Sequence, residues 1–116
     1  MMGKFYSLLG LCKRAGRLAG GEVAAEQAVR GKEARLLVVA GDASANTKKK
    51  FRNSAAYYHI PLAEVGTKAE LGKAVGEDMR AVLAITDAGF AKKLQELANM
   101  EQPEHITEHE NYEKKI

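Results

Sequence analysis

Apolar residues near the start of the chain recur every three or four positions, which is the spacing of one face of an α-helix. They are Phe5, Leu8, Leu9 and Cys12. The pattern predicts a helix over about residues 4–15, and Gly16 directly after it is the residue type that most often ends a helix. Residues 17–19 are then predicted to form a very short strand.

Two stretches are apolar at every position over the length of a strand. They are residues 36–40 (LLVVA) and residues 81–85 (AVLAI). A continuous apolar run is typical of a strand that is buried on both faces, whereas a half-exposed strand alternates apolar and polar residues. We therefore expect both stretches to be central strands of a sheet that helices cover on both sides.

Helical patterns alternate with these strands. Residues 22–30 (EVAAEQAVR) follow Gly20 and Gly21, and their alanines and glutamates favour a second helix, which Gly31 ends. A third helix is predicted from one face that carries Thr47, Phe51, Ser54, Ala55 and Tyr58. A short strand over residues 60–65 is predicted to follow it.

Two further helices are predicted from their N-terminal caps. Thr67 and Glu70 have the spacing of a capping box, in which each side chain accepts the backbone N–H of the other residue. Asp87 is suited to cap a fifth helix. Its apolar face consists of Phe90, Leu94, Leu97 and Ala98. The alternation of helices and strands predicts an α/β fold, a three-layer α/β/α sandwich, over residues 1–100. Residues 101–116 show no apolar face and are predicted to form an acidic, disordered tail.

Basic residues concentrate in the first half of the chain. Residues 1–58 hold 11 Lys and Arg against 4 Asp and Glu, residues 59–100 hold 5 against 6, and residues 101–116 hold 2 against 5. This asymmetry indicates a basic face and a polyanionic partner such as RNA or DNA, although an ordinary solvated surface gives the same counts. The run Lys48-Lys49-Lys50 is by itself more typical of a solvated helix face.

The sequence carries few of the features that an enzyme needs. It has no evident pairing of a nucleophile with a general base, and it has neither the G-x-x-x-x-G-K-[ST] phosphate loop nor G-x-G-x-x-G. His105 and His109 have the i, i+4 spacing of two metal ligands, but no third ligand of comparable quality accompanies them. We therefore expect no catalytic residues, no metal, no cofactor and no small-molecule substrate.

Apolar run length and cysteine content bear on the compartment. No apolar run reaches the ~18 residues of a membrane span, so no membrane association is expected. The single cysteine, Cys12, excludes an internal disulfide, and its place on the apolar face of the first helix marks it as a small core residue rather than a catalytic thiol. These features fit the reducing cytoplasm.

The segment KRAGRLAGGEV, residues 13–23, combines several features of an anion-binding site. Its basic residues are Lys13, Arg14 and Arg17. A guanidinium group can hold a phosphate through two hydrogen bonds. Gly20 and Gly21 stand at the start of the predicted second helix, whose free backbone N–H groups and partial positive charge attract anions. The alternative is that the two glycines only make a tight turn between a strand and a helix.

Four blocks of the sequence, in order and at matching spacing, resemble the bacterial YlxQ family. They are GLCKRAGRLAGGE, LLVVAGDASANTKKK, AELGKAVG and AITDAGFAKKL. That family belongs to a ribosomal protein superfamily that includes L-seven-Ae and L-thirty-e, and the resemblance covers about residues 4–100. It implies an α/β/α sandwich around a small mixed four-stranded sheet. It also implies binding of structured RNA, such as ribosomal RNA, without catalysis and without a cofactor.

The resemblance also bears on which RNA is bound. Members of the superfamily bind kink-turns, sharply bent internal loops with sheared G·A pairs, through a G-x-N-E-x-x-K stretch that opens the second helix. Gly21 matches the motif glycine, but Val23, Ala24 and Gln27 stand at the Asn, Glu and Lys positions. Valine and alanine have no polar group that could read a base edge, so the resemblance implies RNA binding with altered or weakened kink-turn specificity. It further implies contacts from the loop between the last strand and the last helix, over residues 86–90.

The resulting hypothesis is a cytoplasmic RNA-binding protein with no enzymatic activity. The expected RNA-binding residues are Lys13, Arg14, Arg17, Gly20, Gly21, Glu22, Gln27, Thr86, Asp87, Ala88, Gly89 and Phe90. The basic side chains are assigned to phosphate, and the carboxylate of Glu22 is left as a reader of a guanine edge. The loss of the motif Asn and Glu favours an alternative, a protein-interaction module that no longer binds RNA. A phosphate-ligand enzyme is a second alternative, which the missing acid–base pair opposes.

Overall fold

The structure, a computed structural model, describes residues 2–101 and 106–107, with side chains described for residues 2–100. Helices and strands alternate along most of the described chain. Their bounds are α1 Gly3–Arg14, β1 Leu18–Gly20, α2 Glu22–Arg30, β2 Leu36–Val39, α3 Ala45–Tyr58, β3 Leu62–Glu64, α4 Lys68–Ala74, β4 Val82–Ile85, α5 Ala88–Glu101 and β5 Ile106–Thr107.

The strands form one mixed sheet in the order β1-β4-β2-β3-β5. β2 runs parallel to β3, and the other pairs are antiparallel. Every residue of β2 and β4 is buried, and these two strands occupy interior positions of the sheet. The prediction that the two fully apolar stretches are central strands is therefore confirmed.

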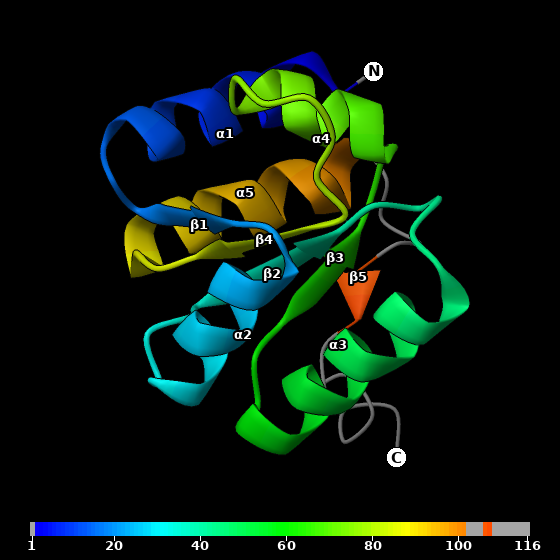
Figure 1. Ribbon diagram of the computed structural model, residues 1–116. Coiled ribbons are helices and arrows are strands. Elements are labelled where there is room, and N and C mark those ends of the chain that lie inside the picture. The colour runs from blue at the N-terminus through cyan, green and yellow to red at the C-terminus, as the bar shows by residue number, and fades with distance from the viewer. Residues whose placement is uncertain (1, 102–105, 108–116) are drawn as a thin grey trace.

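Helices cover both faces of this sheet. Figure 1 shows α1, α4 and α5 on one side of it and α2 and α3 on the other. α1 packs against both α4 and α5, while α2 lies against β1 and β4 and α3 lies against β2. The side chains buried between the layers include Phe5, Leu9, Phe51, Leu71, Leu83 and Leu94. The predicted three-layer α/β/α sandwich is confirmed.

Glycine and side-chain caps set the ends of the helices. Gly16, at φ 72°, ends α1, where the Arg17 N–H donates to the Cys12 carbonyl at 3.0 Å. Such a bond is typical of a helix that ends at a glycine. The capping box of α4 is present as predicted, because the Glu70 N–H donates to Thr67 Oγ1 at 3.1 Å and the Thr67 N–H donates to Glu70 Oε1 at 3.0 Å.

The observed elements differ from the predicted ones in a few places. α3 begins at Ala45, two residues before the first residue of the predicted apolar face, because Ser44 Oγ accepts the Thr47 N–H at 3.1 Å and caps the helix there. β5 is a fifth strand, of two residues, beyond the four strands expected. It pairs antiparallel with Leu62 and Ala63 of β3. Residues 102–105 and 108–116 of the predicted tail, which include His105 and His109, lie outside the described residues.

Candidate functional site

The sheet divides the predicted RNA-binding residues into two groups. Because β1 and β4 are antiparallel, the Thr86 N–H meets the Arg17 carbonyl at one end of the pair, at 2.9 Å. The Gly21 N–H meets the Val82 carbonyl at the other end, also at 2.9 Å. Gly21 lies four residues after Arg17 along extended chain, so the two backbones are roughly 13 Å apart. The loop over residues 86–90 and the two glycines therefore lie at opposite ends of β1.

The turn formed by Gly20 and Gly21 leaves the start of α2 without a side-chain cap. Gly21 is the N-cap residue, at φ 97°, and within the part of the chain that the structure describes no side-chain hydrogen bond caps the helix. By contrast, Ser44, Thr67 and Asp87 cap α3, α4 and α5. The free N–H groups of α2 and its partial positive charge remain available to an anion.

Arg80, which sequence reasoning missed, lies against this turn. A Cβ atom on Gly20 would stand 3.4 Å from Arg80 Nε, and one on Gly21 would stand 4.0 Å from the same atom. Gly20 thus permits the close packing of Arg80, whereas the positive φ of Gly21 fits the turn itself. A lone arginine just before an apolar strand is too common a pattern to indicate this role. We call Gly20, Gly21, the first turn of α2 and Arg80 the glycine-turn surface.

The guanidinium group of Arg80 is held in place by its own loop. Its Nη1 donates to the Met79 carbonyl at 2.8 Å, and its Nη2 lies 3.1 Å from Glu77 Oε1. Its Nε is buried and has no hydrogen-bond partner within the described chain. Lys13, one of the predicted residues, joins the group because its Nζ lies 3.6 Å from Glu77 Oε2. The two cations share the carboxylate of Glu77, and Glu22 in the first turn of α2 adds a second carboxylate to this surface.

Of the other two predicted basic residues, Arg17 lies at the far end of β1, and the guanidinium of Arg14 lies back along α1 near Gly10. Arg14 and Arg17 are both exposed. The backbone of Arg17 is fixed on both sides, since its N–H donates to the Cys12 carbonyl and its own carbonyl accepts the Thr86 N–H. Arg17 therefore stands beside residue 86 of the predicted loop. The structure thus brings Arg17 next to the loop over residues 86–90, as the predicted site requires.

The two predicted residues of α2, Glu22 and Gln27, and the residue at the motif Asn position, Val23, differ in their surroundings. Glu22 Oε2 accepts a hydrogen bond from the Thr47 hydroxyl at 3.2 Å, so one of its two carboxylate oxygens is already used within the protein. Gln27 is exposed one helical turn further on. The side chain of Val23, at the position of the motif Asn, is 73% exposed and presents an apolar surface next to the glycine turn.

Asp87 and Cys12 have structural roles. Asp87 Oδ2 accepts the Phe90 N–H at 2.9 Å and caps α5 as predicted, which explains an acidic residue in a loop that was expected to approach RNA. The Cys12 thiol is buried and donates to the Arg17 carbonyl at 3.2 Å. Burial, followed by the charge of Asp87, raises the pKa of this thiol to about 11. The thiol therefore stays protonated at neutral pH and is a poor nucleophile.

Metal sites and membrane-spanning helices each have recognisable structural features. Across residues 2–100, no cluster of three or more His, Cys, Asp or Glu side chains is arranged to hold a metal ion. Among the helices that the structure describes, none has both the length and the apolar character that crossing a membrane requires.

Comparison with known proteins identifies the family. Residues 3–95 match the model of the Ribosomal protein L7Ae/L30e/S12e/Gadd45 family. The chain belongs to this family. It is 40% identical over 91 residues to the RNA-binding protein YlxQ of Bacillus subtilis (strain 168), a match that covers 78% of this chain and 91% of that protein. It is 43% identical over 94 residues to the RNA-binding protein YlxQ of Enterococcus faecium, covering 81% and 90% of the two chains.

A solved structure agrees with this assignment. A protein of unknown function from Bacillus halodurans C has 40% sequence identity to the chain and a TM-score of 0.80, and the match covers 83% of this chain and 97% of that one. The predicted resemblance to the YlxQ family is thus confirmed. The family description and the relatives' names are those of ribosomal and RNA-binding proteins, and they support the prediction that this protein is not an enzyme.

Proposed function

We propose that this protein binds structured RNA, without catalysis, through the glycine-turn surface. The observation that carries the proposal is the uncapped N-terminus of α2 with the guanidinium of Arg80 packed beside it. Backbone N–H groups, a helix dipole and a fixed guanidinium are three separate sources of attraction for a phosphate. The names of the two YlxQ relatives support RNA as the ligand.

The chemistry of α2 favours contacts to the RNA backbone over contacts to bases. Val23 and Ala24 offer no hydrogen bonds at the positions where the motif has Asn and Glu. Phosphate contacts position an RNA, whereas base contacts specify its sequence. We therefore infer altered or weakened kink-turn specificity, with ribosomal or ribosome-associated RNA in the cytoplasm as the partner.

Replacement of Arg80 tests the proposal. Arg80→Ala removes a phosphate contact, so it should weaken binding to a kink-turn RNA and to a hairpin by similar factors. It should also reduce the slope of log affinity against log salt by roughly 1. Arg80→Lys keeps the charge but loses the planar donor pair, so it should retain the slope while binding less tightly. Fluorescence anisotropy across a salt series measures both quantities.

Lys4→Ala is the matched control for Arg80→Ala. Lys4 is an exposed basic residue in the first turn of α1, at the opposite end of that helix from Lys13. It should change affinity and slope much less than Arg80→Ala. A circular dichroism melt of each variant separates loss of contact from loss of fold. Unchanged affinity and slope in a folded Arg80→Ala variant would contradict the proposal. A wild-type protein that binds neither RNA would favour the alternative of a protein-interaction module.

A further inference from the structure

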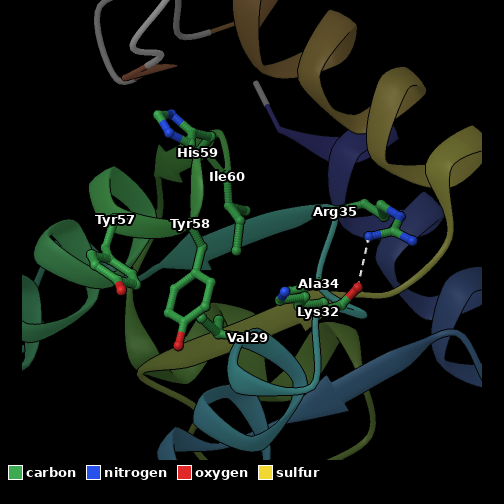
Figure 2. Close-up of a pocket in the computed structure, with 8 residues that line it drawn as sticks. All are labelled: Val29, Lys32, Ala34, Arg35, Tyr57, Tyr58, His59 and Ile60. Atoms are coloured by element: carbon green, nitrogen blue, oxygen red, sulfur yellow. Dashed lines mark hydrogen bonds between the residues drawn. The ribbon is translucent and has the colours of Figure 1, made fainter.

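A groove lies between α2 and α3, away from the glycine-turn surface. It consists of two adjoining hollows of about 570 Å³ and about 500 Å³ that share Val29, Tyr57 and Tyr58. Figure 2 shows the first hollow, with Tyr57 and Tyr58 of α3 facing Lys32 and Ala34 of the turn that follows α2. The Arg35 N–H donates to the Ile85 carbonyl at 2.6 Å, so this hollow stands at the end of the sheet opposite Gly21.

The groove has an exposed aromatic wall. The side chain of Tyr57 is 78% exposed, so its contribution to the core is small. Its ring meets the ring of Tyr58 edge to face, with centroids 4.9 Å apart and an angle of 75° between the planes. A tyrosine ring that is steadied by a neighbour and open to solvent offers a face on which a nucleic-acid base can stack.

The charge of the groove is basic. Among the described residues, those that line the first hollow include Lys32, Arg35 and His59 and no Asp or Glu. The carboxylate in the second hollow belongs to Glu26, and it is neutralised because Arg30 and Lys50 each reach one of its oxygens at 2.9 Å. An aromatic wall with surplus positive charge is complementary to a polyanion that carries bases.

The backbone of the first hollow is unusual as well. Lys32, at φ 61°, and His59, at φ 57°, are the non-glycine residues with a positive φ in the part of the chain that the structure describes. Both line this hollow. Glycine adopts such a conformation without strain. Both residues stand where a helix ends, a position at which a left-handed backbone is common, so these turns place a Lys and a His side chain at the hollow.

We propose that this groove binds an unpaired segment of RNA, with a base stacked on Tyr57 and phosphates near Lys32 and Arg35. The inference rests on the proposed function and adds to it a second contact surface and a class of ligand.

The experiment uses the full chain and two probes, a twelve-nucleotide oligouridylate and a blunt-ended kink-turn RNA. Tyr57→Ala should weaken oligouridylate binding about 10-fold, as expected for the loss of one stacked base, and should leave kink-turn binding unchanged. Tyr57→Phe should retain the affinity. Because the chain has 4 tyrosines and no tryptophan, its emission reports on tyrosine, and the quenching by oligouridylate should fall in Tyr57→Phe.

A second variant tests the groove by charge. Lys32→Gly suits a positive φ, so it should fold with wild-type or greater thermal stability. It should nevertheless bind oligouridylate more weakly and lower the salt slope by roughly 1.

Met100→Ala is the matched control for Tyr57→Ala, because it also removes a large exposed side chain. Met100 is 76% exposed on α5, and its replacement should leave oligouridylate binding unchanged.

The outcomes separate this inference from the proposed function. If the wild type binds the kink-turn RNA but not oligouridylate, the groove inference is overturned and the proposed function stands. If it binds neither probe, both are overturned. If Tyr57→Ala binds oligouridylate as tightly as the wild type, the groove is not an RNA site, which is the result expected of a surface that docks a protein.

Discussion

Val23 shows how one side chain alters what the start of α2 is able to read. It lies two residues after Gly21, is largely exposed, and stands where the superfamily motif has an Asn that contacts a base. Its isopropyl group can neither donate nor accept a hydrogen bond. The backbone around it still presents the uncapped helix start, so we expect the attraction for phosphate to remain while the polar group for a base edge is missing.

Restoring the motif tests this reasoning. The triple variant Val23→Asn, Ala24→Glu, Gln27→Lys supplies two polar groups for base edges and one charge for phosphate. It should increase the preference for a kink-turn over a plain duplex, by roughly 10-fold or more if one good base contact forms. Competition binding with the two RNAs measures the preference. A control with Gln27→Lys alone should tighten binding to both RNAs equally, and an unchanged preference in the triple variant would show that the turn does not present these positions to a base.

At the scale of elements, α4 supports the loop that carries Arg80. The carbonyl of Lys68, the first residue of α4, accepts the Arg80 N–H at 3.0 Å. The Lys68 N–H in turn donates to Asp42 Oδ1 at 2.8 Å. The capping box at Thr67 and Glu70 therefore fixes the start of the helix and one point of the loop after it. The caps of short helices were predictable because both partners lie three residues apart in the sequence.

Removal of this cap should be visible in stability. Thr67→Ala loses the oxygen that accepts the Glu70 N–H, which typically costs about 1 kcal/mol. For a domain of this size that corresponds to a fall in melting temperature of roughly 4–8 °C. Thr67→Ser keeps the oxygen and should remain close to the wild type. Thermal unfolding followed by circular dichroism measures the difference, and equal melting temperatures for Thr67→Ala and Thr67→Ser would show that the cap contributes little.

At the scale of the whole molecule, basic side chains stand near both ends of β1. Arg80 lies at the glycine turn, and Arg17 lies beside Thr86 at the other end of the strand. Glu77 links Lys13 to Arg80, whereas Arg14 and Arg17 are exposed at the end of α1. An RNA that contacts both groups must extend along the edge of the molecule at β1.

The two groups should therefore act independently. Arg14→Ala combined with Arg17→Ala should lower the salt slope of binding to a long structured RNA by roughly 1–2 units. Adding Arg80→Ala should lower it by a further unit, and the changes in binding free energy should add, because the sites are roughly 13 Å apart. Binding measured across a salt series for the three variants tests this. If Arg14→Ala with Arg17→Ala changes neither affinity nor slope, those side chains belong to an ordinary solvated surface.

The sequence by itself determined the helices, the central strands and the caps of α4 and α5. Each of these rests on short-range regularities, such as the apolar run of β4 or the three-residue spacing of Thr67 and Glu70. It also placed Gly20 and Gly21 at the start of the second helix. The family resemblance rested on the same short segments, taken together in their order.

Only the tertiary structure decided which loops meet. The antiparallel pairing of β1 with β4 places Arg80 beside Gly20 and moves residues 86–90 to the opposite end of the strand. The parallel pairing of β2 with β3 brings Lys32 and His59, which precede these two strands, to one hollow from turns that lie far apart in the sequence. The direction in which two strands pair depends on long-range packing of the layers, and no local pattern of residues encodes it. A binding surface built from several loops is therefore settled by the fold, even when each loop can be predicted.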